Sequence, residues 1–149
     1  MTHYYDAIAD GYNALHGEEQ RRKARMILAH THLSKPDRFL DLGGGSGHAT
    51  DEFPCHRVLI DPSPSLIAQA RGEKLRMRAG ALPFPDKHFA LAVAITAIHH
   101  FDDPALCLSE MKRVASQVGV SLLKKAQRYD ELDALIRAGL PGCKVLDDP

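Results

Sequence analysis

The sequence predicts one α/β domain built on an open, mostly parallel sheet of about six strands, doubly wound with helices on both faces. Three observations lead to this fold class. Short apolar runs alternate with helical patterns along the chain, which is typical of parallel strands joined by helical crossovers. A glycine-rich turn follows the first apolar run. The 149 residues, 44% of them hydrophobic, are enough for one buried core and too few for two domains.

The first third of the chain is predicted to be helical. Residues 5–15 and 18–33 carry apolar side chains at helical spacing. The second stretch is expected to end before Pro36, because the residue before a proline disfavours the α conformation. The expected organisation is an N-terminal helical lid segment of residues 1–36, followed by a core of residues 37–149.

The core is predicted to supply the strands and the remaining helices. Short apolar runs bounded by turn residues predict strands at residues 38–42, 57–60, 75–78, 89–96, 118–123 and 144–146. Apolar residues at helical spacing predict helices at 65–71, 104–114 and 129–138, the last of which stops at Gly139. Ligands are expected at the carboxyl ends of the strands.

Charge and composition exclude several classes of protein. The 19 basic and 19 acidic residues cancel, so composition provides no general reason to bind nucleic acid or an acidic membrane surface. No run of about 18 apolar residues occurs, and the N-terminus lacks a secretory signal pattern. The three cysteines and nine histidines show no metal-ligand spacing. We therefore expect a cytoplasmic protein without a metal site.

The glycine-rich turn is the strongest functional signal in the sequence. It reads Asp-Leu-Gly-Gly-Gly-Ser-Gly over residues 41–47. Glycines there allow positive φ angles and let a ligand approach the backbone. Asp61 follows the second predicted strand, where an acid can accept hydrogen bonds from ribose hydroxyls. This pattern favours a nucleotide-like ligand over a plain tight turn with Asp61 as a local cap.

Three kinds of nucleotide site can follow such a strand. A phosphate-binding P-loop requires a lysine after its last glycine, and none follows Gly47. A dinucleotide-binding turn requires a third glycine where this chain has His48 or Thr50. S-adenosylmethionine carries no phosphate, and its amino acid end suits the acid-containing turn of Asp41 and Gly43. This third ligand is favoured.

Five motifs in order resemble those of the class I S-adenosylmethionine-dependent methyltransferases, in particular the small-molecule, quinone and tRNA methyltransferases. The resemblance covers about residues 5 to 114 and implies a Rossmann-like fold and S-adenosylmethionine as cofactor. The motifs are Ile-Ala-Asp-Gly-Tyr-Asn at 8–13, Leu-Asp-Leu-Gly-Gly-Gly-Ser-Gly at 40–47, Ile-Asp-Pro-Ser at 60–63, Leu-Pro-Phe-Pro-Asp at 82–86 and Ala-Ile-His-His-Phe at 97–101.

The resemblance implies a role for each residue of a cofactor site. Asp41 would orient the methionine amino group, and Asp61 would hold the ribose hydroxyls. The backbone of the glycine-rich turn would pack against the cofactor at Gly43, Gly45 and Gly47. The remaining contacts would be Pro62 near the adenine, Gly80 and Ala81 at the adenine edge, Thr96 and Ala97 under the methionine, and Tyr12, with Tyr5, over the cofactor.

His99 and His100 are the candidate catalytic residues. Methyl transfer from a sulfonium mainly requires that donor and nucleophile are positioned and that water is excluded. Where the nucleophile must lose a proton, a histidine near the methyl group can accept it. The alternative is that this pair forms a structural turn.

The sequence departs from the family pattern at four places. One is Ala90, which follows Phe89 where the family usually has an aspartate. Arg78 stands where the family commonly has an acid, so adenine recognition is expected to rest on backbone groups. The segment between Gly47 and Arg57 leaves room for only a short crossover helix. The C-terminal hairpin of the family is shortened to residues 143–146.

These observations predict S-adenosylmethionine-dependent methyl transfer to a small molecule. The alternatives are a tRNA or protein methyltransferase that needs a partner subunit, and a cofactor-binding protein without independent activity. The shortened end leaves a sheet edge that a second copy or a different chain can cover. The acceptor is not specified, because variable loops build its pocket.

Overall fold

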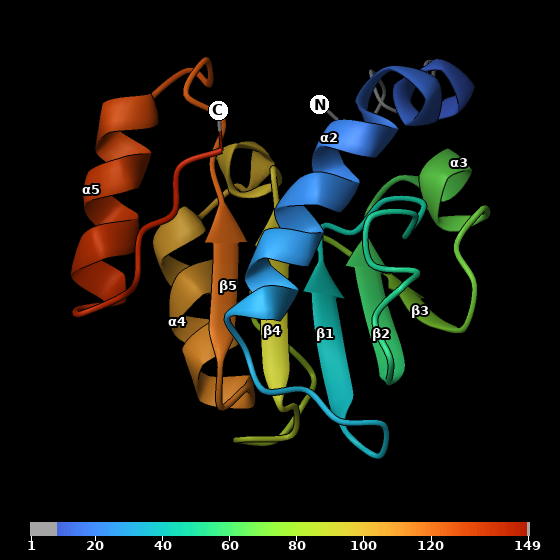
Figure 1. Cartoon of the computed structure of the whole chain (residues 1–149), viewed down its shortest axis with the longest axis horizontal. Helices are drawn as coiled ribbons and strands as arrows, with labels where there is room; N and C mark the ends of the chain where they lie inside the picture. The colour runs from blue at the N-terminus through green and yellow to red at the C-terminus, as the bar shows by residue number, and fades with distance from the viewer. Residues whose placement is uncertain (1–8, 149) are drawn as a thin grey trace.

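A five-stranded parallel sheet forms the centre of the computed structural model, which describes residues 9–148 (Figure 1). Its order is β3-β2-β1-β4-β5, and all paired strands are parallel. The order reverses between β1 and β4, and ligands bind outside the carboxyl ends of strands at such a point. The strands are β1 (Arg38–Leu42), β2 (His56–Asp61), β3 (Glu73–Arg76), β4 (Leu91–Ile95) and β5 (Val118–Ser121).

Helices cover both faces of the sheet, as predicted. α2 (Ala9–Ala29) lies against β4 and β5 on one face, and α4 (Pro104–Val114) covers the other, with α5 (Tyr129–Gly139) beside it (Figure 1). Two short elements, α3 (Pro64–Ile67) and the 3₁₀ helix η1 (Ile98–His100), follow β2 and β4. Among the described residues, no helix combines the length and apolar character needed to cross a bilayer.

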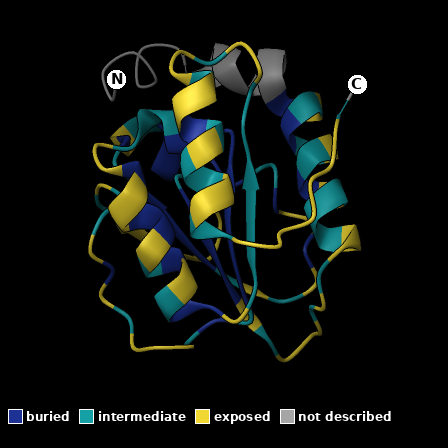
Figure 2. Cartoon of the chain, turned by 90° about the vertical axis from the view of Figure 1, so that its left-hand side faces the viewer, coloured by how far each residue is buried: buried dark blue, intermediate teal, exposed yellow. Residues whose placement is uncertain are grey.

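The core consists of two larger apolar clusters, one on each face of the sheet, and a small third cluster of Leu59, Ile67 and Ala70. On the face under α4, Leu40 and Ile60 pack with Met111. On the face under α2, Phe39 and Val93 pack with apolar residues of that helix. The buried residues of the helices face the sheet, and the exposed ones face outward (Figure 2). Because side chains alternate along a strand, Asp41 shares the face of Phe39.

The prediction of a sixth strand at residues 144–146 is wrong. Residues 144–146 form neither strand nor helix, so the sheet has five strands and ends at β5. Ion pairs hold this C-terminal segment instead of a strand ladder. Arg22 of α2 binds Asp148 at 2.8 Å, and Lys124 binds Asp147 at 3.4 Å.

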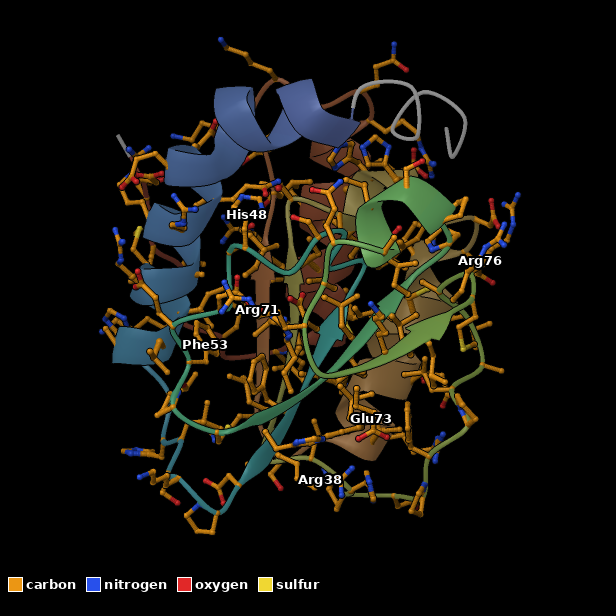
Figure 3. All side chains as sticks on the ribbon, turned by 90° about the vertical axis from the view of Figure 1, so that its right-hand side faces the viewer. Arg38, His48, Phe53, Arg71, Glu73 and Arg76 are labelled. Carbon is orange, nitrogen blue, oxygen red and sulfur yellow. The ribbon has the colours of Figure 1, made fainter. Side chains whose placement is uncertain are left out.

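The N-terminal helix and the first crossover also differ from their predictions. α2 runs unbroken from Ala9 and through Gly17, where two stretches were expected. A glycine inside a helix costs only about 1 kcal/mol, which packing of the inner face can offset. Between β1 and β2 the chain forms successive turns and no crossover helix. This crossover, which carries His48 and Phe53, lies against α2 (Figure 3).

A buried arginine holds the crossover together. The Arg57 side chain, 8% exposed, donates hydrogen bonds to the Gly47 carbonyl at 2.6 Å and the Thr50 hydroxyl at 3.0 Å. It also binds the Arg71 carbonyl at 3.1 Å and pairs with Asp51 at 3.1 Å. A Cβ atom on Gly47 would lie 2.6 Å from the Arg57 guanidinium. Gly47 also has a left-handed φ of +80°, so its backbone conformation and the position of Arg57 together account for the glycine.

Replacing Arg57 tests this arrangement. We expect Arg57→Met to lower the free energy of unfolding by about 2–3 kcal/mol, because the Gly47 carbonyl and Thr50 hydroxyl lose a charged donor. Urea-induced unfolding followed by circular dichroism measures the change. Arg38→Met is the matched control, since Arg38 lies on β1 and pairs with Glu73 at the exposed surface. Its expected change is below about 1 kcal/mol, and equal losses in both variants would contradict the assignment.

Candidate functional site

A cavity of about 290 Å³ opens at the carboxyl ends of β1, β2 and β4. Its volume is near the lower end of the range for small-molecule sites, about 300–1,000 Å³. Its position is the one that the strand order predicts for a ligand. The predicted site residues that line it are Asp41, Gly43, Gly45, Asp61, Pro62, Thr96, Ala97 and His100.

Asp61 joins the ends of the first two strands. One carboxylate oxygen accepts a hydrogen bond from the Gly45 amide at 2.9 Å, and the other accepts one from the Ser63 amide at 2.8 Å. The residue is only 8% exposed. Asp61 is also one of the residues that line the cavity, so its carboxylate can act as a hydrogen-bond acceptor there. The acid thus both shapes the glycine-rich turn and faces the cavity.

Asp41 lies beneath the same turn. Its carboxylate accepts a hydrogen bond from the Thr50 hydroxyl at 2.6 Å. Burial raises the pKa of Asp41 to about 6, although the Thr50 hydroxyl and the positive charge of Arg57 oppose the shift. A Cβ atom on Gly44 would lie 2.6 Å from the Asp41 carboxyl carbon. Because residue 44 is a glycine, the backbone of the turn can pack directly against the Asp41 carboxyl group.

Two glycines of the turn adopt left-handed conformations beside the cavity. Gly43 has a φ of +71° and Gly45 a φ of +59°. A Cβ atom on Gly43 would also approach the Ala97 Cβ to 2.8 Å and the Phe101 ring to 3.0 Å. Side chains would be strained at both positions. Glycine thus keeps this side of the cavity lined by bare backbone.

Thr96 fastens α2 to the end of β4. Its hydroxyl accepts a hydrogen bond from the Gln20 side chain at 3.0 Å and donates one to the Ile95 carbonyl at 2.8 Å. Its amide donates to the Ser121 hydroxyl at 2.8 Å. Gln20, which lines the cavity, was not predicted as a site residue. The sequence pattern that could have indicated Gln20 is its position four residues before Ala24, which puts a polar residue on the helix face that packs on the sheet.

The two candidate catalytic histidines are in ring contact. The His99 and His100 ring centroids lie 3.9 Å apart within η1. Burial lowers the pKa of both, and for His100, where the neighbouring His99 adds to the effect, it falls to about 4. His100 lines the cavity and His99 does not. Both rings are therefore neutral near pH 7, able to accept a hydrogen bond but weak as bases.

Some predicted site residues lie away from the cavity lining. Gly47 is buried with Arg57, Gly80 has open space around it, and Ala81 is exposed. Tyr12 is in α2, with its side chain outside the described residues, and Tyr5 lies outside them altogether. Lining residues that were not predicted include Gly44, Leu66, Met77, Phe101 and Asp102. Phe101 and Asp102 directly follow the histidine pair, and this position in the sequence could have indicated them as site residues.

The residues around the cavity fit the chemistry of S-adenosylmethionine. This molecule has an adenine ring, a ribose with two hydroxyls and a cationic amino acid end. Asp61 provides acceptors for hydroxyls, Asp41 a negative charge for an ammonium group, and Ile60, Pro62 and Leu66 an apolar wall for a ring. Within the described part of the chain, no group of three His, Cys, Asp or Glu side chains could hold a metal ion.

Comparison with known proteins identifies the family. The methyltransferase domain family matches residues 40–123, more than half of the chain. The uncharacterized methyltransferase YcgJ of Bacillus subtilis is 33% identical over 99 residues, which cover 58% of this chain and 39% of that protein. The chain spans less than half the length of the curated relatives it matches.

Solved structures agree with this result. One is the complex between the Haloferax volcanii Trm112 methyltransferase activator and a protein described as a methyltransferase. The match has a TM-score of 0.66 and 27% identity and covers 74% of this chain and 55% of the matched one. A methyltransferase from Thermotoga maritima shares the fold, with a TM-score of 0.69 at 22% identity over 93% of this chain and 80% of its own. The chain belongs to the methyltransferase domain family, within the class I S-adenosylmethionine-dependent methyltransferases.

Proposed function

We propose that this chain binds S-adenosylmethionine in the cavity and supports transfer of its methyl group to a small molecule. One observation carries the proposal: Asp41, Asp61 and the bare backbone of Gly43–Gly45 line a single cavity at the switch point of the sheet. Two acids and a left-handed glycine turn in one place suit a ligand with a ribose and an ammonium group. Family membership supports the same ligand.

Each acid has a separate task in this proposal. Asp61 accepts hydrogen bonds from the ribose hydroxyls with the carboxylate that also accepts those of the Gly45 and Ser63 amides. Asp41, once ionised, attracts the ammonium group of the methionine end. The distance between the two acids along the sheet then sets the orientation of the ligand in the cavity.

When bound, S-adenosylmethionine would supply the methyl group from its sulfonium and would leave as S-adenosylhomocysteine. The residues around the cavity would hold the acceptor beside the donor and keep water away, which can supply a large part of the rate enhancement. His100 lines the cavity as a neutral ring and can accept a hydrogen bond from an acceptor hydroxyl or amine. With a pKa of about 4, it orients the acceptor more effectively than it removes a proton.

A partner-dependent enzyme is the second candidate. A groove of about 720 Å³ follows the open edge of β5, between α2, α5 and the C-terminal segment. An edge strand presents unpaired backbone groups that another chain can cover. The similar Haloferax volcanii structure is a complex with an activator. As the second candidate we infer that a second copy or a different chain covers this edge. The chain is then either a tRNA or protein methyltransferase that needs a partner subunit, or a cofactor-binding protein without independent activity.

Replacing Asp61 tests the proposed cofactor site. We expect Asp61→Ala to weaken binding of S-adenosylhomocysteine about 10- to 100-fold, because charged hydrogen bonds to the ribose are lost. Titration calorimetry measures the affinity. Asp103→Ala is the matched control: Asp103 also accepts a backbone hydrogen bond, from Leu106 at 3.0 Å, but does not line the cavity. Equal affinity in wild type and Asp61→Ala would remove Asp61 from the site.

The raised pKa of Asp41 predicts that cofactor affinity depends on pH. Below about pH 6 the Asp41 carboxyl is mostly neutral, and above it the ionised form attracts the ligand's ammonium group. S-adenosylhomocysteine should therefore bind about tenfold more tightly at about pH 7 than at about pH 5. Asp41→Asn should flatten this dependence. A pH profile that is unchanged in the variant would show that another group titrates.

The state of association tests the partner proposal. Size-exclusion chromatography with light scattering should show a dimer, or a complex when the chain is isolated with its partner. Methyltransferase assays on the separated fractions should find activity only in the associated form. A stable monomer with full activity would contradict the proposal.

A further inference from the structure

An ion pair closes one side of the cavity mouth. The Arg78 guanidinium lies 3.0 Å from the Asp102 carboxylate, and both residues line the cavity. Arg78 follows β3, whereas Asp102 follows η1 at the end of β4. The pair thus joins segments from opposite sides of β1 and β2. Both side chains are largely exposed, so the pair marks the rim of the cavity and not its floor.

Apolar groups line the cavity next to this ion pair. Met77 and Ala79 contribute from the β3 side, and Phe101 from the side of η1. The Phe101 ring packs closely on Gly43, which fixes its position. Apolar walls from two sides suit a flat aromatic ring, with its polar edge at the rim.

An adenine ring placed there has an exocyclic amino group that donates hydrogen bonds, and a charged acceptor at the rim would bind it more strongly than water does. Among the described residues, three carboxylates line the cavity, those of Asp41, Asp61 and Asp102. Asp41 and Asp61 accept hydrogen bonds from groups of the glycine-rich turn and its neighbours, and they lie under the turn and at the ribose position. The Asp102 Oδ1 atom receives no hydrogen bond from any described residue. Arg78 has only donors, so it cannot accept a hydrogen bond from an amino group.

We propose that Asp102 accepts a hydrogen bond from the exocyclic amino group of the cofactor adenine, and that Arg78 is a positioning residue for this carboxylate. The inference rests on the proposed function of the cavity. Arg78 binds the Oδ2 atom of Asp102 and leaves Oδ1 for the ligand. The acceptor for the base thus comes from the segment after β4. From the arginine at position 78 we had expected backbone groups alone to recognise the adenine. In this proposal the Asp102 carboxylate takes part as well.

A cycle of two ligands and two proteins tests the role of Asp102. The ligands are S-adenosylhomocysteine and its analogue in which hydrogen replaces the exocyclic amino group. Wild type should bind the amino-bearing ligand about tenfold more tightly, and Asp102→Ala should bind both ligands equally. Asp86→Ala is the matched control, because Asp86 is an exposed carboxylate paired with Arg113 outside the cavity. This control should keep the tenfold preference.

Each outcome of the titrations decides a separate point. A preference that survives in Asp102→Ala, or no preference in wild type, would overturn the role of Asp102 and leave the cofactor site intact. Failure of wild type to bind either ligand would overturn the proposed function itself. Arg78→Ala should reduce the preference to about threefold with unchanged affinity for the analogue, as a positioning role requires. Equal loss for both ligands would mean that Arg78 contacts the ring directly.

Discussion

The hydrogen bond from the Gly45 amide to Asp61 is the contact on which the geometry of the site depends. It joins the turn after β1 to the end of β2, and the second oxygen of Asp61 fixes the next turn through Ser63. Two loops from neighbouring strands therefore share one acid. Gly45 makes this bond from a left-handed backbone with a φ of +59°, a conformation that any other residue would adopt only with strain. The acid that we assign to the ribose is thus also the one that shapes the backbone beside it.

The opposite side of the cavity is held by a chain of polar contacts through Thr96. The Gln20 side chain, the Thr96 hydroxyl and amide, and the Ser121 hydroxyl connect α2, β4 and β5. These hydrogen bonds place the Gln20 part of α2 at the rim of the cavity. Thr96 has a left-handed φ of +47°, which is uncommon for a β-branched residue. Such local strain is typical of functional sites, and these hydrogen bonds stabilise the conformation here.

Local signals predicted much of this structure. β1 and α4 have the predicted bounds, because a buried apolar run and a capped apolar stripe are each encoded within a few residues. Asp41 and Asp61 were placed correctly at the ends of β1 and β2 for the same reason. Contacts between distant segments were not predictable in this way. The ion pairs of Asp147 and Asp148, the bond from Gln20 to Thr96 and the approach of Asp102 to Arg78 join residues far apart in sequence, and no local pattern announces them.

Arg57 links the absence of a crossover helix to the charge of the site. With no helix between β1 and β2, the crossover folds around a buried guanidinium instead. That positive charge also acts on Asp41, where it opposes the rise in pKa that burial causes. A helix in this place would carry its own dipole but no buried cation. The short crossover therefore also affects the electrostatics of the site. Burial raises the pKa of Asp41 to about 6, and the Thr50 hydroxyl and then the Arg57 cation oppose that rise, so the acid still ionises at neutral pH.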